Sequence, residues 1–277
     1  MPSGEHGPRR APARGMYILP SLFTAGNIAI GYYAIVESIH GMLSASAVAF
    51  DHAALATIFA MFFDALDGRI ARMTNTQSAF GRELDSLADV ITFGVAPSLL
   101  AYLWGVRQVW PTTYPRAEER LMHFGLVICF LFLICGACRL ARFNISVNPQ
   151  PRNPGRPGRK YFVGMPIPAG AGIVAAVVHF EDGSPIHNPW LSVVWLGLIG
   201  LIGFLMVSNW RFWSGKELDM SQRRPGRLLA LFALIGSILF FESEYAMIVL
   251  AMVYLLSGVF ARLAYSWQRR PATVSSR

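Results

Sequence analysis

Long apolar stretches recur along almost the whole chain, and they limit the possible fold more than any other feature. A stretch of about 20 apolar residues is long enough to cross the hydrocarbon core of a bilayer as a helix. Inside that core every backbone N–H and C=O must bond internally, so such a stretch predicts an α-helix. The chain is 54% hydrophobic and 14% charged, whereas soluble domains carry about 25% charged residues. We therefore expect an all-α, polytopic integral membrane protein.

Eight membrane-spanning helices are predicted from these stretches, of which the seventh is the shortest. Their approximate ranges are 17–36, 47–73, 79–104, 121–143, 163–180, 190–210, 227–241 and 245–267. Residues 1–15 are rich in Pro, Gly and Arg, and we expect them and residues 268–277 to be disordered tails. One membrane-embedded domain, residues 16–267, lies between the two tails.

Basic residues are distributed unequally between the two sides of this predicted topology. If the N-terminus is cytoplasmic, all but three of the 24 Lys and Arg residues fall on the cytoplasmic side, the exceptions being Arg107, Arg116 and Arg120. This bias satisfies the positive-inside rule, and an even number of spans returns the C-terminus to the cytoplasm. We expect a multi-pass protein of the cytoplasmic (inner) membrane. The net charge of +8 then reflects topology and attraction to anionic lipids rather than binding to nucleic acid.

Four aspartates interrupt the apolar pattern where the second and third predicted helices meet: Asp64, Asp67, Asp85 and Asp89. A charged side chain at the centre of a membrane helix costs about 2.5–3.5 kcal/mol. Residues three or four apart lie on one face of a helix, so each helix presents two carboxylates on one face. The connection between the helices is short, so the helices must pack side by side. We expect the four carboxylates to converge at the cytoplasmic end.

Such a cluster predicts a metal site. Four carboxylates cannot all remain ionised close together without cations. All-oxygen ligands favour Mg²⁺ or Mn²⁺, with Ca²⁺ possible, and two ions bridged by carboxylates suit phosphoryl transfer. Gly68 and Gly81 leave room beside the carboxylates, and Arg72 supplies a fixed cation. The alternative is that the aspartates are solvated helix-end charges paired with arginines, which their number and spacing disfavour.

The pattern D-x2-D-G-x2-A-R-x8-G-x3-D-x3-D, from Asp64 to Asp89, resembles the signature of the CDP-alcohol phosphotransferase family. The resemblance implies a six-helix core, a homodimer, and two divalent ions that hold the diphosphate of a CDP-linked lipid. It implies that Asp64, Asp67 and Asp85 are metal ligands, and that Asp89 is both a ligand and the base that takes the proton of the attacking alcohol. Four further residues would line the nucleotide pocket: Gly68, Ala71, Arg72 and Gly81.

Other stretches resemble the phosphatidylserine synthase branch of that family, namely residues 17–35, 138–145, 161–172 and 206–217. This implies CDP-diacylglycerol and L-serine as substrates. Arg139 and Arg142 end the fourth helix, where either could bind the carboxylate of serine or anchor the helix at the membrane surface. We favour Arg142 slightly, because Asn144 adds an amide nearby. Asn27 either reaches the nucleotide pocket or bonds a neighbouring helix. The prolines near residue 166 either line the acceptor pocket or simply kink the start of a helix.

Three other functions compete with this interpretation. A sister enzyme could use glycerol phosphate or inositol phosphate, whose second phosphate would call for more arginines around the pocket. A membrane prenyltransferase also uses aspartates and Mg²⁺, but its aspartate pairs would lie on well-separated helices. A cation transporter would place its carboxylates near the middle of the membrane, whereas these aspartates are predicted at helix ends.

Overall fold

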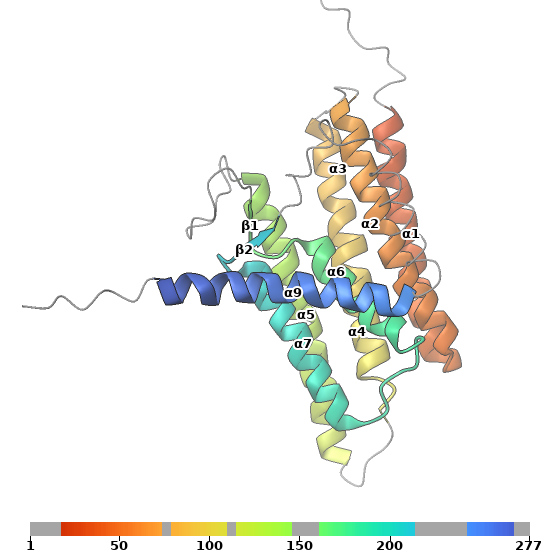
Figure 1. Ribbon diagram of the computed structural model, residues 1–277. Helices are drawn as coiled ribbons and strands as arrows, with labels where there is room; N and C mark the ends of the chain where they lie inside the picture. The colour runs from red at the N-terminus through yellow and green to blue at the C-terminus, as the bar shows by residue number, and fades with distance from the viewer. Residues whose placement is uncertain (1–17, 74–78, 110–114, 146–160, 214–242, 269–277) are drawn as a thin grey trace, which may run out of the picture.

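The part of the protein that the structure describes is a bundle of long helices with one small pair of strands (Figure 1). The computed structural model describes residues 18–73, 79–109, 115–145, 161–213 and 243–268, and the side chains within residues 22–65, 80–109, 115–145, 161–212 and 243–263. The elements are α1 (Ile18–Ser44), α2 (Ala47–Met73), α3 (Ala79–Asp89), η2 (Val90–Val95), α4 (Ala96–Gly105), α5 (Pro115–Ile145), β1 (Tyr161–Val163), α6 (Ile167–Phe180), α7 (Pro189–Val207), β2 (Arg211–Trp213) and α9 (Ser243–Gln268).

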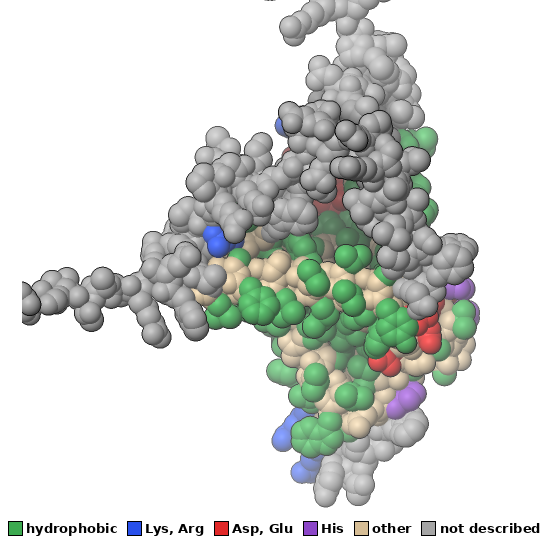
Figure 2. All heavy atoms as spheres, viewed as in Figure 1, with side chains coloured by type: hydrophobic (Ala, Val, Ile, Leu, Met, Phe, Trp, Pro, Cys, Tyr) green, Lys and Arg blue, Asp and Glu red, His purple; other side chains and the backbone are tan. Residues whose placement is uncertain are grey.

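The prediction of an all-α membrane protein is confirmed. Within the described residues, six helical segments are long and apolar enough to span a bilayer, and α6 is a shorter apolar helix. Large apolar side chains cover much of the outer surface, as Figure 2 shows, and Leu43, Trp190 and Val194 are each at least 70% exposed. This surface suits contact with lipid rather than with water. The predicted seventh span, 227–241, lies outside the described residues, so the count of eight stays a prediction.

Several predicted helix bounds were wrong for two physical reasons. The first helix continues to Ser44 and the fourth begins at Pro115, because hydropathy marks the apolar part of a helix and not its polar ends. The fifth begins at Ile167 rather than at 163. Pro166 has an extended backbone and Pro168 lies in the first turn of α6, where a missing N–H is tolerated.

The helix that carries two of the aspartates changes its winding immediately after them. Residues Val90–Val95 form the π-helix η2, and the N–H of Ala96 bonds to the carbonyl of Ile91, five residues earlier. Pro97 follows in the first turn of α4, and it has no N–H to continue an α-helical ladder. On α1, a Cβ at Gly31 would fall 2.8 Å from the Cα of Thr92. The glycine therefore lets α1 pack directly against η2.

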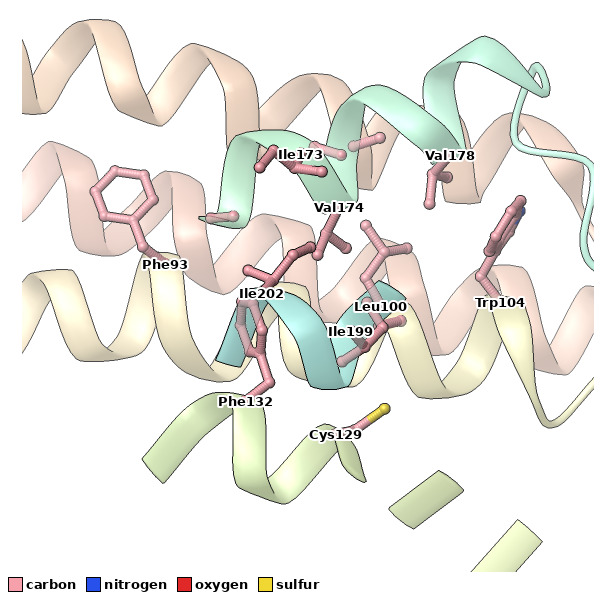
Figure 3. Packing of buried hydrophobic residues seen from close by; sticks show 14 of the residues in the cluster. Phe93, Leu100, Trp104, Cys129, Phe132, Ile173, Val174, Val178, Ile199 and Ile202 are labelled. Carbon is pink, nitrogen blue, oxygen red and sulfur yellow. The ribbon is translucent and has the colours of Figure 1, made fainter. Parts of the chain in front are cut away.

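The core lies where α4, α5, α6 and α7 meet, and Figure 3 shows Phe93, Leu100, Phe132 and Ile202 within it. Trp104 and Trp195 pack edge to face with their ring centroids 5.1 Å apart. Their indole N–H groups donate to the carbonyls of Gly183 (3.1 Å) and Ala101 (3.0 Å). These contacts fasten α4 to α7 and to the turn after α6, at the end of the bundle opposite the aspartates.

The strands β1 and β2 were not predicted. They pair antiparallel, with Tyr161 opposite Trp213 and Val163 opposite Arg211. The helix α9 packs against α6 and, in Figure 1, lies across the direction of the other long helices. Its Tyr254 stacks on Phe212 of β2, with ring centroids 5.8 Å apart. This contact packs α9 against the strand pair.

Candidate metal and acceptor site

Three of the four predicted aspartates converge. One carboxylate oxygen from each of Asp64, Asp85 and Asp89 lies within 4.8 Å of the other two. Asp64 belongs to α2, and the other two are four residues apart on α3, so helical spacing on α3 and the approach of Asp64 to that face produce the cluster. The side chain of Asp67 lies outside the described residues, as do those of Gly68, Ala71 and Arg72, although α2 continues as a helix to Met73.

The cluster has the chemistry of a hard-cation site. Asp89 is 9% exposed, and the buried Oδ1 of Asp85 has no hydrogen-bond partner within the described residues. Asp64 and Asp85 are close enough to repel each other. Carboxylates this close and this buried are stable as anions only beside positive charge, and oxygen donors select Mg²⁺, Mn²⁺ or Ca²⁺. The three residues therefore fit a divalent cation.

Asn27 lies on α1 in a fully buried position. Neither its amide oxygen nor its amide nitrogen has a hydrogen-bond partner among the described residues, although its side chain is 0% exposed. Its main-chain carbonyl accepts a 3.1 Å hydrogen bond from the hydroxyl of Thr92, which lies one turn beyond Asp89. This contact places Asn27 beside the start of η2. Gly81 lies one turn before Asp85 on α3 and is partly exposed.

Arg142 forms hydrogen bonds with the backbone of neighbouring segments. Its guanidinium donates to the carbonyl of Val207 at 2.9 Å, and to those of Val163 and Ser208 at 3.3 Å each. A Cβ at Gly164, whose φ is +72°, would lie 2.9 Å from Nη2 of Arg142, so the glycine is needed both for its conformation and for space. Arg142 thus ties the end of α5 to β1 and to the end of α7.

Arg139, one turn earlier, has different surroundings. It is 7% exposed, and its guanidinium lies over the rings of Phe143 (5.5 Å) and Phe162 (5.7 Å). Asp89 and Tyr254 are close enough to interact with it electrostatically. The sequence named Arg139 as a candidate but gave no sign of Phe162 or Tyr254, because these come from β1 and α9, far away along the chain. Asn144 also bonds Ser86 of α3 at 2.8 Å, which holds α5 beside the aspartates.

A second polar cluster lies at the opposite end of the bundle. Nδ1 of His179 is 2.5 Å from a carboxylate oxygen of Asp51, and its Nε2 is 3.0 Å from the hydroxyl of Ser243. The three residues come from α6, α2 and α9. Since Asp51 is near the start of α2 and Asp64 near its end, this cluster is separate from the candidate metal site.

The fold and the acidic cluster define a class, that of integral membrane proteins with a hard-cation site at one end of a helical bundle. Within that class the family is clear, because the CDP-alcohol phosphatidyltransferase model matches residues 17–199. The chain belongs to this family, which confirms the resemblance predicted from the aspartate spacing. The match is to neither of the two more distant alternatives, the prenyltransferases and the cation transporters.

Several curated relatives carry one name, CDP-diacylglycerol–serine O-phosphatidyltransferase. The protein of Helicobacter pylori strain J99 is 35% identical over 248 residues, which cover 90% of this chain and 92% of the relative. That of Bacillus subtilis is 37% identical over 213 residues, or 76% of this chain and 99% of the relative. That of Mycobacterium tuberculosis strain H37Rv is 29% identical over 266 residues, which cover 94% of this chain and 83% of the relative.

Proposed function

We propose that the protein transfers the phosphatidyl group of CDP-diacylglycerol to the hydroxyl of L-serine, which forms phosphatidylserine and releases CMP. The observation that carries the proposal is the convergence of Asp64, Asp85 and Asp89 within 4.8 Å, in a chain that belongs to the CDP-alcohol phosphatidyltransferase family. The acceptor is inferred from relatives that bear the serine-specific name and align with most of the chain.

The carboxylates would hold the divalent cations of the family. Asp64, Asp67, Asp85 and Asp89 would bind two ions, Mg²⁺ or Mn²⁺ with Ca²⁺ as an alternative. Such ions supply stabilisation of the charge that develops on diphosphate oxygens. We assign the nucleotide pocket to Gly68, Ala71, Arg72, Gly81 and Asn27, of which Asn27 is supported by its buried, unbonded amide.

Asp89 would act as the general base. Its carboxylate takes the proton of the serine hydroxyl, whose oxygen attacks the phosphatidyl phosphorus. The new P–O bond forms to serine while the bond between that phosphorus and the oxygen of CMP breaks, and CMP leaves with the bonding electrons. A hydroxyl is a weak nucleophile at neutral pH, so a base within hydrogen-bond reach is needed. The low exposure of Asp89, 9%, limits competition from water.

We further propose that the protein lies in the cytoplasmic membrane with its aspartates and both termini on the cytoplasmic side. The unequal distribution of the 24 Lys and Arg residues supports this orientation. We also propose a homodimer, by analogy with the family, with membrane lipids around it and no nucleic acid among its ligands.

The test is release of CMP by the purified protein in detergent, with CDP-diacylglycerol, a divalent cation and one acceptor at a time. We expect release with L-serine that exceeds release with glycerol phosphate or inositol phosphate by at least about tenfold. Release with a phosphorylated acceptor but not with serine would overturn the serine assignment and retain the family chemistry. No release with any acceptor, from folded protein, would overturn the proposed reaction as a whole.

A further inference from the structure

Arg139 is a buried cation, and none of the ion pairs found among the described residues involves it. Its side chain is 7% exposed, and its Nε is buried without a hydrogen-bond partner within the described residues. Its guanidinium lies over the ring faces of Phe143 and Phe162. A guanidinium has five N–H donors in a planar fork, and leaving a buried donor such as this Nε–H unbonded is unfavourable. Such a group in a folded protein calls for a ligand to complete it.

The neighbouring Arg142 shows that this situation is specific to Arg139. The guanidinium of Arg142 is held by main-chain carbonyls of Val163, Val207 and Ser208. It therefore shapes the backbone around the site, and its donors are already directed at protein oxygens. The two arginines, three residues apart on α5, thus have separate roles.

The position of Arg139 relative to Asp89 suggests the ligand. The two side chains lie close enough to interact electrostatically. The hydrogen bond between Asn144 and Ser86 holds the end of α5 against α3 beside them. A small molecule with a carboxylate at one end and a hydroxyl near it could therefore contact Arg139 and Asp89 together.

We propose that Arg139 binds the carboxylate of the acceptor amino acid and so directs its hydroxyl toward Asp89. A planar carboxylate accepts two parallel hydrogen bonds from a guanidinium, and the flanking rings of Phe143 and Phe162 strengthen the pair by excluding water. The acceptor pocket then selects hydroxy amino acids over alcohols that lack a carboxylate. This inference rests on the proposed function, and it replaces Arg142 with Arg139 as the preferred acceptor residue. The diphosphate of the nucleotide is the other anion that the same guanidinium could bind.

The experiment compares wild-type protein with Arg139→Gln, Arg139→Lys and the control Arg262→Gln, which removes an exposed charge from α9. Binding of radiolabelled L-serine is measured by equilibrium dialysis with Mn²⁺ present, and KM is measured for each substrate by CMP release. We expect Arg139→Gln to weaken serine binding and raise KM for serine at least about tenfold, with KM for CDP-diacylglycerol within about twofold of wild type. Arg139→Lys should be intermediate and the control unchanged. L-alanine should displace the label from wild type, whereas ethanolamine, which lacks the carboxylate, should not.

Two results would overturn the assignment. Serine binding by a folded Arg139→Gln variant equal to wild type would show that the carboxylate binds elsewhere. A rise in KM for CDP-diacylglycerol with KM for serine unchanged would assign Arg139 to the diphosphate. Because the dialysis needs no turnover, Arg139-dependent binding of serine without CMP release would support this inference while contradicting the proposed reaction.

Discussion

The hydroxyl of Thr92 donates a hydrogen bond to the main-chain carbonyl of Asn27 and so joins η2 to α1. The side-chain amide of the same Asn27 is fully buried and has no hydrogen-bond partner among the described residues. The main chain of Asn27 therefore contributes to the contact between α1 and η2, and we propose that its side-chain amide binds the nucleotide. The proposal gives Thr92 a structural role and Asn27 a binding role, and it can be tested by substituting each side chain.

Asn27→Leu should raise KM for CDP-diacylglycerol by about tenfold, because the proposed contact with the nucleotide is lost. It should not lower the melting temperature in detergent, because the amide has no hydrogen-bond partner among the described residues and its removal costs little or nothing. Thr92→Val is the matched variant. It should lower the free energy of unfolding by about 1 kcal/mol, the usual contribution of one hydrogen bond, and leave KM unchanged. If Asn27→Leu behaves like Thr92→Val in both measurements, Asn27 is a packing residue.

Asp89→Asn should abolish CMP release while binding of CDP-diacylglycerol largely persists, because the amide cannot accept the proton of serine but keeps the size of the side chain. Asp64→Asn should weaken both, because it damages the metal site. Asp182→Asn, an exposed position in the turn after α6, serves as the control and should match wild type. Binding measured beside turnover tests the assignment, and equal loss of binding in the Asp64 and Asp89 variants would contradict it.

Chelation with EDTA should abolish CMP release, and added Mn²⁺ or Mg²⁺ should restore it, because the converging carboxylates of Asp64, Asp85 and Asp89 need cations to approach the diphosphate. The metal alone should also raise the melting temperature of wild-type protein, since a ligand that binds the folded state stabilises it. Asp85→Asn should lose most of that increase. An equal increase in the variant would place the bound metal elsewhere.

Arg142→Gln should destabilise the protein by at least about 2 kcal/mol, because one hydrogen bond to a charged donor contributes about 1.5–3 kcal/mol and three main-chain carbonyls lose theirs. Detergent melting curves give the comparison. In the fraction that remains folded, KM for serine should stay within about threefold of wild type. A selective rise in KM for serine at normal stability would return the acceptor role to Arg142.

His179→Gln should lower the melting temperature and leave kcat and both KM values unchanged. The histidine joins α2, α6 and α9 through Asp51 and Ser243. This cluster lies at the end of the bundle away from Asp64, Asp85 and Asp89. The exposed His123 on α5 provides the control, and His123→Gln should change neither stability nor activity. Loss of activity in a stable His179→Gln variant would show that this end of the bundle contributes to catalysis.

The convergence of the aspartates could be predicted because it depends on local geometry. Helical spacing sets Asp85 and Asp89 on one face, and a short connection brings α2 and α3 together, so the sequence contains most of what is needed. The contacts of Arg142 could not be predicted, because its partners Val163 and Val207 are 21 and 65 residues away. The same holds for Phe162 beside Arg139. Basic residues at a helix end look alike in a sequence, and only the packing shows which one already has partners.

The π-helix η2 has a consequence for how this scaffold can change. Its wider winding accommodates an extra residue between Asp89 and Ala96, compared with an α-helix of the same length. Deleting one residue there would turn α3 by about 100° relative to α4, because each α-helical residue advances by that angle. The carboxylates would then face away from Asp64 while Leu100 and Trp104 kept their places in the core. The extra residue in η2 thus sets the direction in which Asp85 and Asp89 point relative to α4.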